Sequence, residues 1–183
     1  MNNQKLVFII AGEPSGDHHA AEYIKEHSKI NTNIRFDAFG QSEIKNTNAK
    51  IIYDTEKISV IGIIEVITRY KEILNALKIA KDYIKKNKPD LIILVDYIEF
   101  NLKIAKFAKS LGIPVLFYIA PQVWAWRERR AKNFIKSIDF LAVIFPFEEI
   151  YFKKYTNNVT YVGHPLSKKL DLISSNKDYN QRN

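Results

Sequence analysis

Residues 11–17, Ala-Gly-Glu-Pro-Ser-Gly-Asp, combine two carboxylates and a hydroxyl just after a predicted strand. The segment is not a phosphate loop, because its glycines do not fit Gly-x-Gly-x-x-Gly and no Gly-Lys-Ser/Thr follows. Glu13 and Asp17 at the start of a helix would repel a phosphate, whereas carboxylates there suit the hydroxyl groups of a sugar. A well-capped helix start is the competing interpretation, and it accounts for Ser15 and Asp17 better than for Glu13.

Asp96 is the second place where we expect a carboxylate to meet a ligand. It directly follows Leu91–Val95, an uninterrupted apolar run that predicts a central parallel strand covered on both faces. In open α/β sheets, ligands bind outside the carboxyl ends of such strands. The alternative is that Asp96 only caps the next helix or turn, and this stretch alone supports both interpretations equally.

Both tryptophans of the chain lie in residues 121–127, Pro-Gln-Val-Trp-Ala-Trp-Arg, in a predicted loop at the carboxyl end of another strand. Trp124 and Trp126 are suited to stacking on a sugar ring, and Arg127 to pairing with a phosphate. The alternative is that the tryptophans close an edge of the domain and the arginine lies on a helix surface. The motif supports both interpretations equally.

The segment Ile61–Asn87 predicts a long amphipathic helix, because apolar residues recur in it at intervals of three and four. Such a stripe usually packs against a core. A rim of lysines beside it is also typical of a helix that lies on an anionic bilayer. Both interpretations are open, and the candidates for membrane contact are Ile64, Ile67, Ile73, Leu74 and Leu77.

The elements that must position these residues alternate between strand and helix. We expect strands at Lys5–Ile10, Ile34–Phe39, Ile51–Tyr53, Leu91–Val95, Val115–Ile119, Phe140–Phe145 and Val159–Val162. Helices are expected at Asp17–Ser28, Ile61–Asn87, Asn101–Leu111, Glu128–Ser137 and Pro146–Tyr155. This alternation predicts an α/β fold with a Rossmann-like, doubly wound parallel sheet.

Composition narrows the class of protein. The net charge of +8 suits a polyanionic partner but does not distinguish nucleic acid, anionic lipid and a phosphorylated substrate. No nucleic-acid-binding signature accompanies it, so we expect no nucleic-acid partner. The sequence has no cysteine, no signal peptide and no apolar run long enough to span a bilayer, which predicts a soluble, cytosolic chain.

Several segments, in this order, resemble the N-terminal half of the lipid-A-disaccharide synthase family. They are residues 11–17, Gly62–Val66, Asp96 with Phe100–Asn101, Val123–Arg127, Phe145–Glu148 and Gly163–Leu166. Each motif is weak alone, whereas the ordered set with Trp-Ala-Trp-Arg is specific. The resemblance extends over residues 5–166.

The resemblance implies the N-terminal, acceptor-side lobe of a glycosyltransferase-B fold. The implied reaction is an inverting transfer from UDP-2,3-diacylglucosamine to 2,3-diacylglucosamine 1-phosphate, with no metal or cofactor. It also implies peripheral attachment to the cytosolic face of the inner membrane. The family's essential aspartate, a candidate general base, falls on Asp96, and its first-loop acidic residue falls on Glu13. The substrate-binding candidates are Ser15, Asp17, Asn101, Trp124, Trp126 and Arg127.

The sequence departs from the family at Pro14 and His19, and at Ile98 and Glu99 in the loop after the aspartate. We expect residues 1–172 to form the lobe and residues 173–183 to be a polar tail or the start of a linker. Members of the family are longer and carry a second, donor-binding lobe. Three explanations of the shorter chain are open: it is a fragment, a truncated gene product or half of a split enzyme. In the last case it would pair with a separate C-terminal half or form a homo-oligomer. A catalytically inactive lobe that binds lipid is the alternative function.

Overall fold

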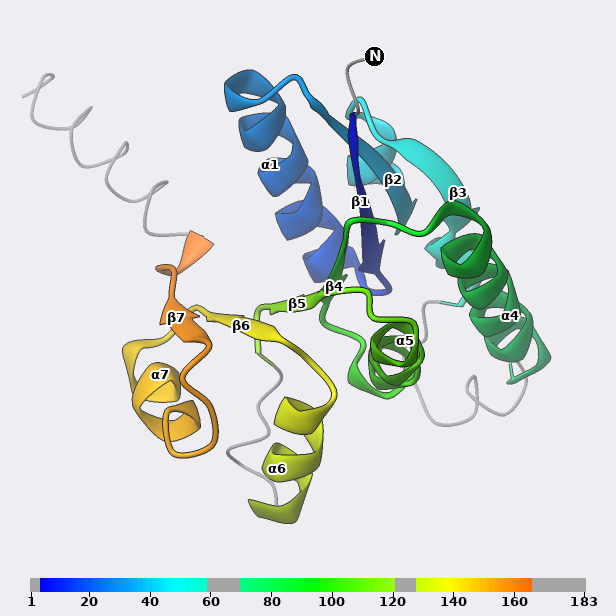
Figure 1. The fold of residues 1–183 in the computed structure, drawn as a ribbon. Helices are drawn as coiled ribbons and strands as arrows, with labels where there is room; N and C mark the ends of the chain where they lie inside the picture. Colours follow the sequence, from blue (N-terminus) through cyan, green and yellow to red (C-terminus); the bar gives the residue numbers. More distant parts are fainter. Residues whose placement is uncertain (1–3, 59–69, 121–127, 166–183) are drawn as a thin grey trace, which may run out of the picture.

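The computed structural model describes residues 4–58, 70–120 and 128–165. These residues form a seven-stranded sheet, paired in parallel throughout, in the order β3-β2-β1-β4-β5-β6-β7. The strands are β1 (Lys5–Ala11), β2 (Ile34–Gly40), β3 (Lys50–Asp54), β4 (Leu91–Val95), β5 (Val115–Tyr118), β6 (Phe140–Val143) and β7 (Val159–Tyr161). The predicted α/β class and doubly wound parallel sheet are confirmed (Figure 1).

Helices cover both faces of this sheet. They are α1 (Pro14–Ile30), α2 (Ser42–Lys45), α4 (Tyr70–Asn87), α5 (Ile98–Ser110), α6 (Glu128–Lys136) and α7 (Pro146–Phe152), with a 3₁₀ turn η1 (Thr55–Lys57) after β3. Buried residues of α1 and α2 belong to one core cluster, and those of α4, α5, α6 and α7 belong to a second. In Figure 1, α1 accordingly lies on one side of the sheet and α4 and α5 lie on the other.

The two cores follow from the alternation of side chains along each strand. In β1, Phe8 and Ile10 belong to the cluster of α4 and α5, whereas Val7, Ile9 and Ala11 belong to the cluster of α1. β4 has the same alternation, so both central strands are buried on both faces. Both strands therefore read as continuous apolar runs in the sequence.

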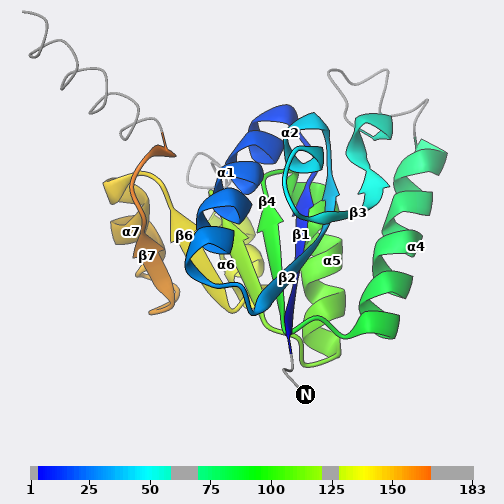
Figure 2. The ribbon, with the colours of Figure 1, turned by 90° about the horizontal axis from the view of Figure 1, so that it is seen from above.

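The order in which successive strands are added to the sheet changes direction between β1 and β4, although all strands remain parallel. From β1 the chain continues to β2 and β3 on one side, and from β4 it continues to β5, β6 and β7 on the other. The two neighbouring central strands thus send their connections to opposite sides, and in open α/β sheets ligands bind in the crevice expected at the carboxyl ends of such strands. The chain leaves β1 after Ala11 and β4 after Val95, which are paired in register, and Figure 2 shows the two strands side by side and pointing the same way.

The inner face of α4 is a core element, as its periodicity predicted. Leu77, Ala80 and Ile84 are buried, so the interpretation of Leu77 as a membrane contact is wrong. Ile73 is partly buried and packs against the same core, whereas Leu74 remains 44% exposed. The other two candidates, Ile64 and Ile67, lie outside the described residues.

Several element boundaries differ from the sequence prediction. The first helix begins at Pro14 rather than Asp17, because proline fits the first position of a helix. The helix after β4 begins at Ile98 rather than Asn101. The short elements α2 and η1 were not predicted, since neither is long enough to show a periodic pattern.

Candidate active site

Asp96 begins the turn that joins β4 to α5. Its φ is 49° and that of Tyr97 is 43°, so two consecutive residues with side chains adopt the left-handed conformation. The helix α5 has Tyr97 at its N-cap position, without a side-chain capping bond. Asp96 is therefore not the N-cap of the helix, which removes the helix-capping part of the alternative interpretation.

The carboxyl of Asp96 faces the loop that follows β1. The hydroxyl Oγ of Ser15 donates a hydrogen bond to its Oδ2, at 3.4 Å. Burial and the nearby negative charge of Glu13 raise the pKa of Asp96 to about 6, and the bond from Ser15 opposes this rise. The structure thus brings together three of the predicted site residues, and it gives one of them a proton affinity suited to general base catalysis near neutral pH.

Glu13 and Ser15 are exposed beside this partly buried carboxyl. Glu13 is the N-cap residue of α1 in an extended conformation, and its side chain makes no capping bond, which leaves the carboxylate accessible from the crevice. Ser15, in the first turn of α1, is likewise exposed, so neither Ser15 nor Asp17 is the N-cap that the sequence suggested. Both exposed side chains lie where a ligand in the crevice would meet them.

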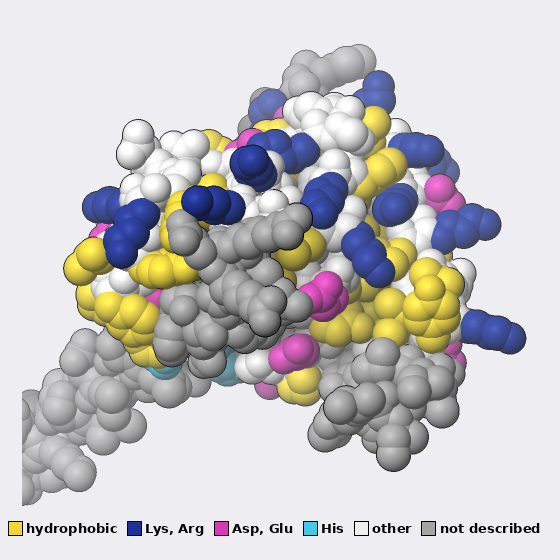
Figure 3. All heavy atoms as spheres, turned by 90° about the horizontal axis from the view of Figure 1, so that it is seen from below, with side chains coloured by type: hydrophobic (Ala, Val, Ile, Leu, Met, Phe, Trp, Pro, Cys, Tyr) yellow, Lys and Arg dark blue, Asp and Glu magenta, His cyan; other side chains and the backbone are white. Residues whose placement is uncertain are grey.

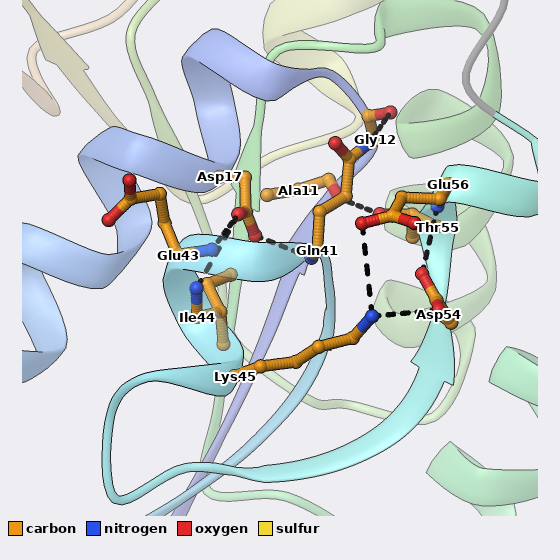
Figure 4. Close-up of polar contacts among 10 residues, drawn as sticks. All are labelled: Ala11, Gly12, Asp17, Gln41, Glu43, Ile44, Lys45, Asp54, Thr55 and Glu56. Atoms are coloured by element: carbon orange, nitrogen blue, oxygen red, sulfur yellow. Dashed lines mark hydrogen bonds and ion pairs between the residues drawn. The ribbon is translucent and has the colours of Figure 1, made fainter.

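Asp17 has a structural role, in contrast to the predicted contact with a sugar. It is only 1% exposed, and its oxygens accept hydrogen bonds from backbone N–H groups at the start of α2. Oδ1 accepts from Gln41 at 2.6 Å, and Oδ2 accepts from Glu43 at 2.8 Å and from Ile44 at 3.4 Å (Figure 4). A carboxylate at the positive end of α2 fastens that helix to α1.

Two further side chains hold the backbone at the end of β1. The hydroxyl of Thr55 donates to the carbonyl oxygen of Ala11 at 2.9 Å, and the amide of Gln41 donates to that of Gly12 at 3.2 Å (Figure 4). Both side chains are buried. The strands β2 and β3 thus fix the course of the loop that carries Glu13. Neither residue was predicted from the sequence, since a single buried Thr or Gln carries no periodic signal.

Lys45 and Asp54 form an ion pair at 2.8 Å beside this loop (Figure 4). The hydrogen bond from Lys45 lowers the pKa of Asp54. Asp54 also accepts from the backbone of Glu56 at 3.1 Å, which stabilises the 3₁₀ turn that carries Thr55. The pair thus stabilises the segment that follows β3.

Tyr97 packs its ring against the loop after β1. A Cβ atom at Gly12 would lie 2.3 Å from Cδ1 of Tyr97, so this position must be glycine for the ring to fit. The ring stacks on Phe100, with centroids 5.4 Å apart, and its hydroxyl donates to the carbonyl oxygen of Ile58 at 3.3 Å. Tyr97 therefore connects three segments around Asp96, a role that its type in the sequence did not indicate.

Asn101 is fully buried in the first turn of α5, at 0% exposure. Its amide Nδ2 donates to the carbonyl oxygen of Val95 at 3.1 Å and to that of Asp96 at 2.7 Å. The predicted direct contact between Asn101 and a substrate is therefore wrong. Its side chain lies behind the turn, because α5 begins three residues before the predicted start.

The predicted ligands Trp124, Trp126 and Arg127 lie outside the described residues. A motif farther along the chain, Phe145–Glu148, has a structural use: the carboxylate of Glu148 accepts a hydrogen bond from the backbone of Phe145 at 3.2 Å, at the start of α7.

Among the described residues, no group of three or more His, Asp or Glu side chains is arranged to hold a metal ion. No helix in this part of the chain is long and apolar enough to cross a bilayer.

The fold is that of one lobe of a glycosyltransferase-B protein. A solved structure of MurG from Acinetobacter baumannii superposes with a TM-score of 0.56 and 16% identity, over 87% of this chain and 45% of that one. UDP-N-acetylglucosamine 2-epimerase from Rickettsia bellii superposes with a TM-score of 0.63 and 16% identity, over 94% of this chain and 48% of that one. At these identities the similarity establishes the fold alone.

The sequence profile of the family described as lipid-A-disaccharide synthetase matches residues 7–183, and the chain belongs to this family. It is 42% identical to the lipid-A-disaccharide synthase of Nitrosococcus oceani over 165 residues, which is 90% of this chain and 43% of that protein. It is also 42% identical to lipid-A-disaccharide synthase 1 of Legionella pneumophila strain Paris, over 97% of this chain and 46% of that protein. The chain thus spans slightly less than half the length of these relatives.

Proposed function

We propose that this chain is the acceptor-binding lobe of an inverting glycosyltransferase that joins two acylated glucosamine units. The donor is UDP-2,3-diacylglucosamine and the acceptor is 2,3-diacylglucosamine 1-phosphate. The observation that carries the proposal is Asp96, a largely buried carboxyl at the reversal point of the sheet, with a pKa raised to about 6. A base with this pKa is mostly deprotonated at neutral pH and still has a useful affinity for a proton.

Asp96 acts as the general base in this proposal. Its carboxylate accepts the proton of the acceptor 6-hydroxyl while that oxygen forms a bond to the anomeric carbon of the donor. The bond from the anomeric carbon to the phosphate oxygen breaks, and UDP leaves with the electron pair. Glu13 and Ser15, exposed beside Asp96, bind and orient sugar hydroxyl groups. One base suffices for inversion, so no nucleophilic carboxylate is needed.

In this proposal the donor is bound chiefly by a second lobe, and the relatives are long enough to contain one. In support, the loop after β1 places a carboxylate at the N-terminus of α1, where nucleotide-binding folds place a phosphate. We therefore expect residues 1–183 alone to bind UDP weakly. Calorimetry that finds a micromolar affinity for UDP would contradict this assignment of the donor site.

The experiment that tests the function is a chimera with the Nitrosococcus oceani relative. Residues 7–165 of this chain replace the matching segment of that enzyme, and release of UDP is measured with both acylated substrates. We expect turnover, and a loss of at least ~10²-fold in kcat after Asp96→Asn, with KM for the acceptor nearly unchanged. If the chimera folds but forms no product while the parent enzyme is active, only the alternative function remains, that of an inactive lobe that binds lipid.

The same proposal places the lobe on the cytosolic face of the inner membrane. The start of α4 supports this, because Tyr70 is 56% exposed and Leu74 is 44% exposed. Figure 3 shows a face on which Lys and Arg side chains gather together with hydrophobic ones. This combination is typical of surfaces that bind anionic lipid.

Vesicle co-sedimentation tests the membrane contact. Binding to anionic vesicles is expected to persist partly at high salt, because salt screens lysines but not apolar insertion. Leu74→Ser should reduce the salt-resistant fraction. Ile30→Ser is the matched control, since Ile30 is 82% exposed but ends α1, which packs on the other face of the sheet from α4. Complete release of the wild type at modest ionic strength would contradict an apolar contact.

A further inference from the structure

Asn101 carries the only side-chain amide that donates, among the described residues, to the backbone of the turn after β4. The side chain is completely buried. Besides its two side-chain bonds to Val95 and Asp96, its backbone N–H donates to the carbonyl oxygen of Tyr97 at 3.0 Å. One residue thus binds three successive carbonyl groups, from the last residue of β4 to the residue before α5.

The turn that Asn101 holds has an unfavourable backbone. Asp96 and Tyr97 both have positive φ, a conformation in which the Cβ atom of an L-residue crowds the backbone. Such a conformation persists only where surrounding interactions impose it. The side chain of Asn101 binds the carbonyl groups of Val95 and Asp96, and its backbone N–H binds that of Tyr97, so the side-chain bonds constrain the first half of this turn.

The orientation of the Asn101 amide shows that its NH₂ group, rather than its oxygen, forms the hydrogen bonds to the turn. The carbonyl oxygens of Val95 and Asp96 require a donor, so Nδ2 must face them. The other end of the amide, Oδ1, is buried without a hydrogen-bond partner among the described residues. Burying an unsatisfied acceptor is unfavourable, and a leucine of similar shape would avoid that cost. The amide is therefore best explained by the two bonds that it donates.

We propose that Asn101 is a positioning residue, whose side-chain amide clamps the β4–α5 turn so that the carboxylate of Asp96 faces Ser15 and Glu13. Its importance for catalysis rests on the proposed function, in which Asp96 is the base. The clamp itself does not rest on that function, because it is defined by the geometry of the turn. Asn101 acts on the substrate only through Asp96.

Titration of Asp96 by carboxyl ¹³C NMR tests the clamp in residues 1–183 without any substrate. In the wild type we expect the pKa of about 6 that burial and Glu13 produce. In Asn101→Leu the turn relaxes, the carboxyl gains water and separates from Glu13, and its pKa should fall below ~5. Asn87→Leu is the matched control, since the Asn87 amide donates to the carbonyl oxygen of Tyr83 at 2.9 Å in α4, away from the turn. It should leave the titration of Asp96 unchanged.

A second variant and a wild-type measurement keep the test decisive if Asn101→Leu does not fold. The hydroxyl of Asn101→Ser can donate to one carbonyl at most, so the pKa of Asp96 should take an intermediate value. In the wild type, the side-chain amide protons of Asn101 should exchange with solvent far more slowly than those of Asn87. Fast exchange at Asn101, or a folded variant in which Asp96 titrates as in the wild type, would overturn the proposal.

Activity of the chimera separates this inference from the proposed function. We expect Asn101→Leu to lower kcat at least ~10-fold, with KM nearly unchanged and the acidic limb of the pH–rate profile displaced to lower pH. If Asp96 titrates as predicted but the unmutated chimera is inactive, the clamp stands and the proposed function fails. If kcat falls without any displacement of the profile or of the titration, Asn101 is not a positioning residue for Asp96.

Discussion

The carboxylate of Asp96 packs against the first turn of α1 at Gly16, where that turn has no side chain. A Cβ atom at position 16 would lie 3.2 Å from Oδ2 of Asp96 and 3.4 Å from Cγ1 of Val95. Both glycines of the loop after β1 thus make room for residues of the β4 turn, since Gly12 accommodates the ring of Tyr97. A loop in the position of a phosphate-binding loop instead receives a carboxylate and a tyrosine.

Gly16→Ala should impair catalysis more than folding. Alanine is favoured over glycine in a helix by up to about 1 kcal/mol, which offsets a small displacement of the Asp96 carboxyl. That displacement, a few tenths of an ångström, should reduce kcat of the chimera about 10-fold, because the base must be aligned with the acceptor hydroxyl. Urea denaturation and turnover check the two effects.

Gly112→Ala is the control for Gly16→Ala. Gly112 lies in the turn after α5 with a φ of 70°, and no neighbouring atom lies within 4 Å of the position of a Cβ. Its substitution should therefore lower stability through backbone strain and leave turnover unchanged. Unchanged turnover in Gly16→Ala would mean that the reaction tolerates displacement of Asp96.

Gly12→Ala should be strongly destabilising, because its Cβ atom would overlap the ring of Tyr97 at 2.3 Å. We expect a loss of about 2–3 kcal/mol in the free energy of unfolding. Combined with Tyr97→Ala the added cost should largely vanish, which gives a coupling of at least ~1 kcal/mol in a double-mutant cycle. Urea denaturation of the four proteins measures it, and additive effects would show that the ring moves aside freely.

The sheet was predictable from the sequence because its central strands are buried on both faces. Leu91–Val95 is an uninterrupted apolar run, and the strand in the structure has these same bounds. The proximity of Glu13 and Asp96 follows from the pairing of β1 with β4, since the carboxyl ends of neighbouring parallel strands meet at one edge. What the sequence predicted well depends on periodicity and on chain topology.

The details of the site were not predictable, because they depend on contacts between distant segments. Asp17 was expected at a ligand, but it accepts hydrogen bonds from Gln41 and Glu43, which the sequence does not place beside it. The left-handed conformation of Tyr97 was not predictable, because glycine and asparagine are the residues that usually indicate it and position 97 is a tyrosine. The burial of Asn101 depends on where α5 begins, and helix boundaries are read poorly from sequence.

Asp17→Ala should destabilise the protein while leaving the crevice residues themselves intact. The substitution removes the acceptor for backbone N–H groups of Gln41 and Glu43 in a buried position, at a cost of about 3 kcal/mol. Asp82→Ala on the exposed face of α4 is the control, with an expected change within about 0.5 kcal/mol. Urea denaturation distinguishes them, and similar small changes in both variants would contradict the structural role of Asp17.

Asp96→Asn should stabilise the fold at neutral pH even though it removes the proposed base. The folded-state pKa of Asp96, about 6, lies above the ordinary value of 3.8, so folding disfavours the ionised form. The unfolded state then binds fewer protons between these values, and the contribution of Asp96 to stability decreases as pH rises from about 4 to 6. Asparagine avoids this penalty, which amounts to at most about 3 kcal/mol above pH 6.

The difference in unfolding free energy between Asp96→Asn and the wild type should therefore be near zero below about pH 4 and reach its full value above pH 6. Asp90→Asn is the control with the opposite sign, since hydrogen bonds from Lys5 and Leu6 lower the pKa of Asp90. Its smaller effect should be a destabilisation that disappears as pH falls. Urea denaturation from about pH 2 to 8 measures both differences, since the effect of Asp90→Asn disappears only below the ordinary carboxyl pKa of 3.8. A wild type as stable as Asp96→Asn at every pH would show that Asp96 titrates normally, and the proposed base would lose its strongest support.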